Sequence, residues 1–199
     1  MTEASQTLTP GQDGKKRCFG NKPGQRFYAD YHDNDWGRQV HNDQMLFEML
    51  ILEGAQAGLS WETVLKKRTG YRRAFFDFEV ATVAAMSDAA LEALRHDPGI
   101  VRNRLKIAAP RRNAQAFLEI QSAFGSFDAY LWRFVDGRPR VGQWRTLADV
   151  PTTTPDSDAL SKDLQQRGMR FVGSTIVYAY MQAVGMANDH LMDCWRYGG

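Results

Sequence analysis

The sequence lacks the features that mark membrane and secreted proteins. No stretch approaches the roughly 18 uncharged apolar residues that a transmembrane helix needs. The start of the chain, MTEASQTLTPGQDGKK, has no apolar middle of the kind found in a signal peptide. We therefore expect a cytoplasmic protein with no membrane partner.

Patterns typical of β-strands are scarce and no internal repeat is evident, so we expect an all-α fold. With 199 residues and 43% hydrophobic content, the chain can bury a core as one domain or as two small lobes sharing a cleft. Residues 1–16 are polar and have no periodic apolar positions, which predicts a disordered tail. We place a single helical domain with two lobes at residues 17–199.

The clearest helical period starts at Asp43, a plausible N-cap, and predicts a helix to about Ala57. Gly58 breaks this pattern and Ser60 restarts it, so the sequence QAGLS is expected to form a tight loop between two helices. Further helices are expected at residues 81–84, 88–95, 102–124 with a kink at Pro110, 127–134, 157–166 and 174–184. The Pro/Thr-rich segment 151–155 is a linker, after which Asp156 or Ser157 could cap the next helix.

The net charge is only +2, but the positive charge is concentrated in two runs. Residues 66–73 (KKRTGYRR) and 101–112 (VRNRLKIAAPRR) each contain five bases and no acid. Such runs form either solvated helix faces or phosphate-binding surfaces. Phosphate binding becomes the better interpretation only where a second, independent signal points to nucleic acid.

The only two cysteines stand near opposite ends of the chain, and each has a histidine partner. His32 follows Cys18 by fourteen residues, while His190 precedes Cys194 by four, which would put that pair on one face of a helix. Two thiolates and two imidazoles form the ligand set of a closed, structural zinc site that would clip the two ends of the chain together. Two unrelated buried cysteines remain an alternative, whereas a disulfide is disfavoured in a reducing cytosol.

Residues 166–180 (QRGMRFVGSTIVYAY) resemble the helix-hairpin-helix element of DNA repair glycosylases. Gly168 and Gly173 would let the backbone approach a phosphate, which the free amides of the helix starting at Ser174 would then bind. The basic residues around this segment are Lys162, Arg167 and Arg170. The alternative is that a glycine between two helices is a simple helix C-cap.

Two segments combine aromatic residues with one carboxylate and several glycines. The first contains Tyr31 and Trp36, and the second runs from Glu53 to Trp61. An alkylated adenine is a flat cation, which aromatic rings bind by stacking and by cation–π attraction. In this interpretation Glu53 accepts hydrogen bonds from the edge of the base; alternatively it is an ordinary helix acid, either solvated or paired within the protein.

Four segments between Arg17 and Cys194 together resemble the DNA-3-methyladenine glycosylase I family. They are YHDNDWG, LFEMLILEGAQAGLSWETVLKKR, PTTTPDSDALSKDLQQRGMRFVGSTIVYAYMQAVGM and NDHLMDC. The resemblance implies an all-α, helix-hairpin-helix DNA glycosylase fold in which a structural Zn²⁺ joins the N- and C-terminal segments. The implied zinc ligands are Cys18, His32, His190 and Cys194. The implied pocket for 3-methyladenine consists of Tyr31, Trp36, Glu53 and Trp61.

The resemblance further implies that Gly58 and Leu59 enter the duplex at the vacated base position. The implied activity is hydrolysis of the N-glycosidic bond of 3-methyladenine in alkylated double-stranded DNA, with free 3-methyladenine as the product. Glycosylases that also cut the strand have a lysine where this chain has Thr175, so we expect a monofunctional enzyme without a Schiff-base step. A monomer is the default for an enzyme that slides on DNA.

The chain departs from the family pattern at several positions. Gly20 stands where members commonly have tryptophan, so Phe19 is a candidate for the missing pocket wall. The interval from Cys18 to His32 is one residue longer than usual, and Leu105 stands near a family glycine. Asp189 corresponds either to the catalytic aspartate of other hairpin glycosylases or to a hydrogen-bond partner of a zinc-bound His190.

Two other functions compete with glycosylase activity. A non-catalytic module that binds alkylation damage or nucleic acid would keep the same fold, and Gly20 is the feature that leaves this alternative open. A zinc-stabilised helical interaction protein would explain the cysteines and histidines but not the carboxylate among aromatic residues. Substitution of Glu53 separates these functions.

Overall fold

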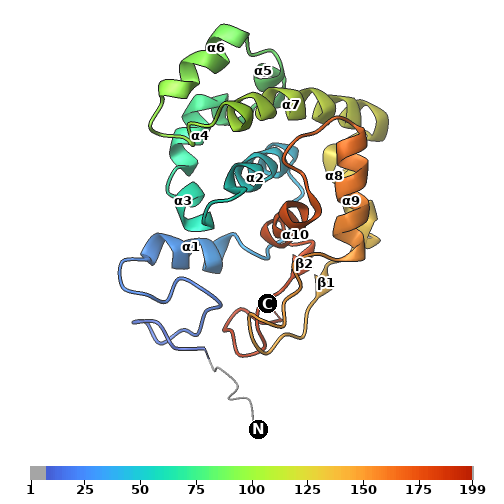
Figure 1. Cartoon of the computed structure of the whole chain (residues 1–199). Coiled ribbons are helices and arrows are strands. Elements are labelled where there is room, and N and C mark those ends of the chain that lie inside the picture. Colours follow the sequence, from blue (N-terminus) through green and yellow to red (C-terminus); the bar gives the residue numbers. More distant parts are fainter. Residues whose placement is uncertain (1–7, 199) are drawn as a thin grey trace.

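The structure of the chain is a computed structural model that describes residues 8–198, and it is mostly helical, as predicted (Figure 1). The α-helices are α1 (Arg26–Asn34), α2 (Asp43–Gln56), α3 (Trp61–Leu65), α4 (Arg68–Ala74), α5 (Val80–Ala84), α6 (Asp88–Ala93), α7 (Arg104–Phe124), α8 (Phe127–Leu131), α9 (Pro155–Gln166) and α10 (Ser174–Ala183). Three short 3₁₀ segments are η1 (Phe76–Phe78), η2 (Leu94–His96) and η3 (Trp132–Val135). Two short strands, β1 (Arg140–Val141) and β2 (Ala187–Asn188), pair in parallel.

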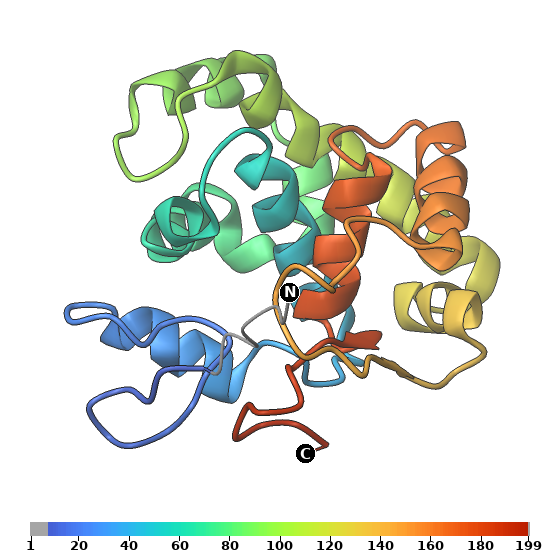
Figure 2. The same ribbon diagram turned by 60° about the horizontal axis from the view of Figure 1, so that its bottom comes forward.

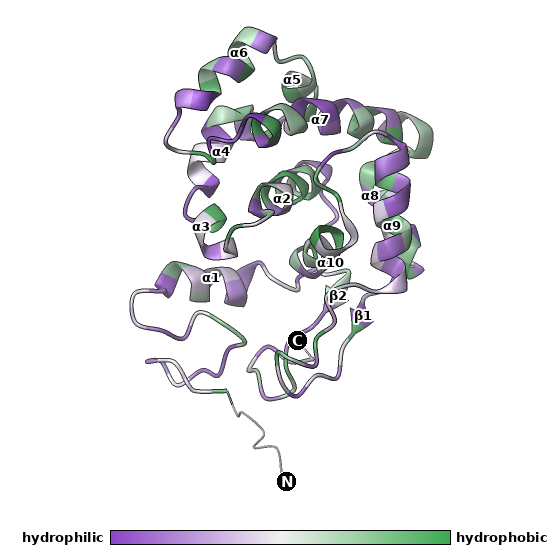
Figure 3. Cartoon of the chain, in the orientation of Figure 1, coloured by the Kyte–Doolittle hydropathy of each residue, from purple (hydrophilic) through white to green (hydrophobic). Residues whose placement is uncertain are grey.

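Helices α2 and α10 pack against each other at the centre of the molecule (Figure 1). Helix α7 passes along one side of α2 with α5 and α6 beyond it, α8 packs beside α7 and α2, and α9 packs against α10. Every residue of α2 from Leu46 to Ala55 is buried. A helix that is enclosed on all sides has no polar face, and Figure 3 accordingly shows mainly hydrophobic residues on α10 and on much of α2.

The N- and C-terminal parts of the described chain lie side by side, on the side of the molecule away from α5 and α6 (Figure 2). Cys18, Leu191 and Cys194 form a small apolar cluster there that is separate from the main core. The backbone amide of Trp195 donates to the carbonyl of Lys16 at 2.9 Å. Packing therefore brings together two segments that are more than 170 residues apart in sequence.

Part of the predicted tail contacts the rest of the protein. Pro10 pairs with Lys16 in an antiparallel bridge, and the buried guanidinium of Arg17 forms ion pairs with Asp13 and Asp33. Residues 1–7 lie outside the described residues, so a disordered tail over residues 1–16 stays a prediction. No helix in the described part of the chain is long and apolar enough to cross a membrane.

The predicted helices are present, and the corrections concern their ends. Asn42, not Asp43, caps α2, because its side chain accepts a hydrogen bond from the amide of Met45 at 3.0 Å. The carboxylate of Asp43 instead accepts from amides at the start of α8. Thr154 caps α9 in a reciprocal capping box with Ser157, so neither Asp156 nor Ser157 is the N-cap.

Three further differences concern the start of α7 and two helices that were not predicted. Helix α7 starts at Arg104 because the side chain of Asn103 caps it; Pro110 lies within the helix, and the kink expected there stays a prediction. Helices α1 and α4 were not among the predicted helices, because neither segment has a clear apolar period. Each of them buries only three residues.

The basic residues of the run 66–73 form hydrogen bonds and ion pairs with other residues of the protein. The buried carboxylate of Glu48 on α2 accepts hydrogen bonds from both Arg68 and Arg72. The remaining contacts of the run are Lys66 with Glu62, Lys67 with the carbonyl of Pro98, Arg68 with Asp35, and Arg73 with Asp97. The structure therefore favours an internal role for this run over phosphate binding.

Candidate active site and metal site

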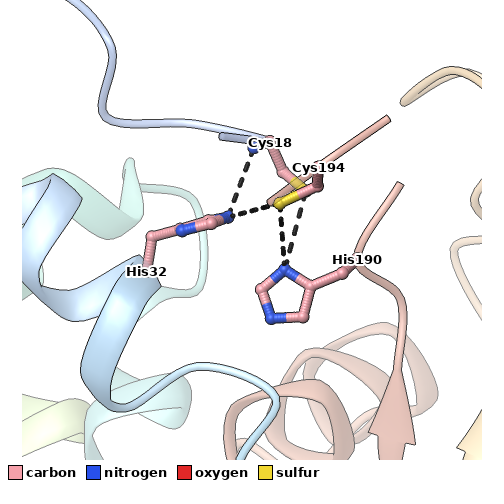
Figure 4. Close-up of side chains that lie close together, drawn as sticks. All are labelled: Cys18, His32, His190 and Cys194. Carbon is pink, nitrogen blue, oxygen red and sulfur yellow. Dashed lines mark hydrogen bonds between the residues drawn. The ribbon is translucent and has the colours of Figure 1, made fainter. Parts of the chain in front are cut away.

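The four predicted metal ligands come together at the junction of the two terminal segments (Figure 4). The thiol sulfur, or one ring nitrogen, of each residue lies within 4.8 Å of the other three, and all four residues are buried. Cys194 Sγ lies 3.4 Å from His32 Nε2 and 3.6 Å from His190 Nδ1, and Cys18 Sγ lies 3.8 Å from the same His190 nitrogen. These four residues can hold a metal ion.

The surroundings of the cluster orient the two imidazoles. The other ring nitrogen of His32 lies 2.8 Å from the carboxylate of Asp33, and that of His190 lies 3.3 Å from the carbonyl of Trp36. Such partners fix which nitrogen of a histidine faces a metal. The two sulfurs also accept hydrogen bonds from backbone amides, Cys18 from Leu191 and Cys194 from Arg196.

His190 lies four residues before Cys194, a spacing that would place both on one helix face, but the segment is not helical. Both residues belong to the irregular segment that follows β2. The hydrogen bond between the two thiols, together with burial, raises the pKa of Cys18, while the same hydrogen bond lowers the pKa of Cys194.

The four predicted aromatic pocket residues form a continuous cluster next to the metal ligands. The ring centroid of Phe19 lies 5.1 Å from that of Trp36 and 6.3 Å from that of Tyr31, which lies 5.4 Å from that of Trp61. Trp36 also packs edge-on against His190 at 4.6 Å. The aromatic cluster and the metal ligands thus form one packed unit.

Glu53 on α2 is buried, with 4% of its surface exposed. No described residue donates a hydrogen bond to its carboxylate, so burial alone raises its pKa to about 8. Its charge contributes to raising the pKa of Tyr31, which places the carboxylate near the rings. The buried indole N–H of Trp61 also lacks a partner among the described residues. A solvated helix acid, one of the alternative interpretations of Glu53, is excluded by this burial.

Tyr28 is a member of this cluster that sequence reasoning missed. Its ring stacks on Phe19 at 4.6 Å, and burial together with the charges of Glu62 and Glu53 raises its pKa to about 12. Tyr28 lies three residues before Tyr31 on α1, so the two share a helix face. That spacing was the available signal, but it requires knowing that the segment is helical.

The structure explains why position 20 holds glycine. Gly20 has φ +85°, and a Cβ atom there would lie 2.6 Å from the backbone nitrogen of Ala29. A tryptophan at this position would require a different backbone. The ring of Phe19 instead packs among the aromatic residues, as described above.

The connection between α9 and α10 (residues 167–173) is held in place by side chains from other elements. Buried Asn113 on α7 donates to the carbonyl of Arg170 at 3.0 Å and accepts from its amide at 2.8 Å. Arg112 donates to the carbonyl of Gly168 at 2.7 Å, and Ser161 donates to that of Val172 at 2.7 Å. These bonds fix the backbone of the connection from both sides.

The two glycines of this connection have different roles. Gly168 directly follows Arg167, the C-cap residue of α9, and has φ +87°. It therefore ends the helix, which was the alternative to a phosphate-binding role for this glycine. Gly173 precedes α10 and has no side chain to cap it, so no side chain bonds the first amides of that helix. The hydroxyl of Ser174 is bonded to Ser157 and Asp158.

The predicted basic residues near the connection differ in their contacts. Lys162 and Arg170 are exposed, whereas Arg167 is ion-paired with Asp163 and packs over the rings of Tyr130 and Phe124. The predicted tight loop between helices is confirmed at residues 57–60. In that loop Gly58 has φ +75° with open space around it, and Leu59 is 39% exposed.

Asp189 is not the hydrogen-bond partner of the His190 ring, which was one of its two predicted roles; the catalytic role stays a prediction. Its buried carboxylate accepts hydrogen bonds from Trp144 at 2.7 Å, Tyr178 at 2.5 Å and Gln182 at 2.8 Å. The ring nitrogen of His190 that points away from the other metal ligands contacts the carbonyl of Trp36 and not Asp189. Asp189 therefore ties the segment after β1 to α10.

Comparison with known proteins identifies the family. The family model described as methyladenine glycosylase matches residues 21–197. This chain belongs to the methyladenine glycosylase family. DNA-3-methyladenine glycosylase 1 of Escherichia coli is 49% identical over 172 residues, which cover 86% of this chain and 92% of that protein. The family's enzymes with this name are hydrolases that act on N-glycosyl bonds.

Solved structures of the family have the same fold. A crystal structure of 3-methyladenine DNA glycosylase I superimposes with a TM-score of 0.87 at 46% identity, covering 91% of this chain and 99% of that one. A tyrosine-to-phenylalanine variant of such an enzyme, in complex with 3-methyladenine, gives a TM-score of 0.83 at 39% identity, covering 87% and 91%. The family resemblance inferred from the sequence is thereby confirmed.

Proposed function

We propose that this chain is a monofunctional N-glycosylase that hydrolyses the N-glycosidic bond of 3-methyladenine in alkylated duplex DNA and releases the free base. The observation that carries this proposal is Glu53, a buried carboxylate that no described residue hydrogen-bonds, beside a cluster of aromatic rings. Burying such a group is unfavourable unless a ligand compensates it. A related enzyme whose structure contains 3-methyladenine supports the identity of that ligand.

In this proposal the base is recognised by charge and shape together. The cationic adenine lies against the rings of Tyr31, Trp36, Trp61 and Phe19, and the carboxylate of Glu53 accepts hydrogen bonds from its edge. A normal adenine carries no positive charge, so it cannot compensate the buried carboxylate. Selection of the damaged base thus rests on the desolvation of Glu53.

The chemical step needs little acid catalysis, because the leaving base is already cationic and its glycosidic bond is weak. The ionised Glu53 and the rings position the base and favour the positive charge that develops on the sugar in an oxocarbenium-like transition state. Thr175 supplies no amine for a Schiff base, so water is the nucleophile and the DNA strand stays intact.

We further propose that α9, residues 167–173 and α10 form a helix-hairpin-helix element that binds the DNA backbone. The uncapped amides of α10 after Gly173, including that of Ser174, suit a phosphate oxygen. The basic residues assigned to the same surface are Lys162, Arg167 and Arg170. Gly58 and Leu59, on their exposed loop, enter the duplex where the flipped base was.

The metal proposed for Cys18, His32, His190 and Cys194 is a structural Zn²⁺, because two thiolates and two imidazoles complete its tetrahedral ligand set. Bound zinc would stabilise the junction of the terminal segments. We also propose that residues 17–199 act as a single domain of two lobes with the base pocket between them. In this proposal the protein works as a monomer in the cytoplasm, on DNA and without a membrane partner.

The test is release of free bases from methylated genomic DNA by the purified protein, separated by chromatography. Selective release of 3-methyladenine over 7-methylguanine supports the proposal. A folded, metal-loaded protein that binds the DNA but releases no base would contradict it and favour a non-catalytic module that binds alkylation damage.

Replacing Asn113 with alanine is expected to weaken DNA binding without weakening the binding of free 3-methyladenine. The substitution removes both hydrogen bonds to Arg170, worth about 2 kcal/mol together, and loosens the connection that precedes α10. Fluorescence anisotropy with labelled duplex and calorimetry with the free base measure the two affinities separately. Gln115→Ala is the control, because its amide on α7 bonds to Ala84 instead. Equal DNA affinities for the two variants would contradict the expectation.

A further inference from the structure

The start of α7 exposes an unusual combination of residues. Arg102, Arg104 and Leu105 are all exposed, and Leu105 is 69% exposed, the largest value among the exposed large hydrophobic residues that the structure describes. Asn103 caps the helix by accepting hydrogen bonds from the amides of Leu105 and Lys106. The exposed patch therefore sits on an ordered helical turn rather than on a loose loop.

The two arginines of this patch have no hydrogen bond or ion pair with any described residue. The other three bases of the same run are engaged internally. Lys106 bonds to α2, Arg111 pairs with Asp88 on α6, and Arg112 bonds to Gly168. Three basic residues of the run are therefore paired within the protein, whereas the charges of Arg102 and Arg104 face solvent. No contact with another described residue explains an exposed leucine beside two unpaired arginines.

The patch lies next to the loop that contains Leu59. The ammonium group of Lys106, the residue after Leu105, donates to the carbonyls of Ala55 at 2.9 Å and Ala57 at 2.5 Å. Those carbonyls are at the end of α2, immediately before Gly58 and Leu59. These hydrogen bonds hold the first turn of α7 next to the loop at residues 57–60, and both segments have exposed residues.

We propose that the first turn of α7 is a second DNA-contacting surface of this chain, beside the site that Leu59 enters. Arg102 and Arg104 bind backbone phosphates, and Leu105 packs against the sugars next to the opened base step. The inference rests on the proposed DNA glycosylase function and adds a contact that the hairpin and the Leu59 loop do not provide. It is favoured by charge complementarity, because two unpaired guanidinium groups match a polyanion.

The two kinds of contact in this surface have different signatures. Each arginine that binds a phosphate releases counterions, so its loss lowers the slope of log Kd against log salt concentration by about 1. Leu105 contributes by burying apolar area, so its loss lowers affinity by about fivefold without changing that slope. A patch that is only a solvated helix end produces neither effect.

The experiment measures binding of the full-length protein to a duplex with a central tetrahydrofuran abasic site, by fluorescence anisotropy at several salt concentrations. The variants are Arg102→Ala, Arg104→Ala and Leu105→Ala. Arg138→Ala and Leu147→Ala are the matched controls, because Arg138 is exposed without a described side-chain partner and Leu147 is 60% exposed. Leu147 lies in the segment after β1 and not on α7.

We expect a reduced salt slope for both arginine variants, a weaker affinity for Leu105→Ala, and wild-type behaviour for both controls. Binding of free 3-methyladenine is expected to stay unchanged in all five. If wild-type protein binds the duplex and releases base but the variants behave like their controls, this inference alone is wrong. If wild-type protein does not bind the duplex, the proposed function and the inference are both wrong. Melting temperatures measured for each variant separate lost contacts from unfolding.

Discussion

Cys194→Ala is expected to release one zinc ion per chain and to lower the melting temperature by about 10 °C or more. The four ligands join segments more than 170 residues apart, so the metal closes a loop that spans most of the chain. Structural zinc sites contribute about 10 kcal/mol of apparent binding free energy at neutral pH. In a chain of this size each lost kcal/mol lowers the melting temperature by about 2–4 °C.

Metal analysis of the purified protein and thermal denaturation with and without a chelator check this expectation. Met192→Ala is the control, because Met192 lies in the same terminal segment but is 46% exposed and is not one of the four ligands. A Cys194→Ala protein that melts at the wild-type temperature would show that no structural metal is bound there. Wild-type protein purified without zinc, and unaffected by the chelator, would show the same.

Glu53→Gln is expected to abolish base release and to stabilise the protein at the same time. The amide is neutral, so it cannot compensate a cationic base, and binding of free 3-methyladenine is lost with the activity. Burial raises the pKa of Glu53 from 4.5 to about 8. At pH 7 the carboxylate is ionised in the unfolded chain but protonated in the folded one, so folding takes up a proton, which is unfavourable at this pH. Removing this requirement raises the free energy of unfolding by about 3 kcal/mol.

The sign of this stabilisation can be followed with pH. Below pH 4.5 Glu53 is protonated in both the folded and the unfolded chain, so its ionisation does not change the free energy of unfolding. Between pH 4.5 and about 8 the wild-type free energy of unfolding falls relative to that of Glu53→Gln, and above pH 8 the difference is constant. Denaturant unfolding at several pH values measures this difference. Glu119→Gln is the control, because its carboxylate on α7 is exposed. A Glu53→Gln variant that is less stable than wild type at pH 7 would contradict the burial argument.

The activity should show the same ionisation. Because the cationic base needs the ionised carboxylate, kcat/KM for release of 3-methyladenine is expected to rise with pH up to about 8 and then to level off. Initial rates on methylated DNA, corrected for uncatalysed base loss, measure this profile. A profile that is flat between pH 6 and 8 would show that Glu53 is already ionised in the free protein.

Prediction from the sequence succeeded where the pattern was local or the side-chain chemistry was distinctive. The apolar period after Asp43 located the central helix α2, and the break at Gly58 located the loop after it. Cys18 and Cys194 could be paired with histidines because so few residues of these types are present. Glu53 stood out as an acid in an apolar helix, although its interpretation depended on the aromatic residues nearby.

Other features could not be predicted, because they depend on contacts between distant segments. Helices α1 and α4 are stabilised by packing and by ion pairs such as Arg68 with Glu48, and these pairs have no signature in either segment alone. Asp189 was assigned two roles from its neighbours in sequence. Its three hydrogen-bond donors come from residues 7 to 45 positions away.

The sequence by itself determined the helical class, the boundaries of the main helices to within a few residues, and the residue types available for metal and base binding. It could do so because helical periodicity, turn residues and ligand chemistry are local properties. Only the tertiary structure decided which arginine and lysine side chains are free to contact DNA, why position 20 holds glycine, that Tyr28 joins the aromatic cluster, and how strongly the pKa of Glu53 is raised. Those properties depend on burial and on distances between side chains, which arise only when remote segments pack together.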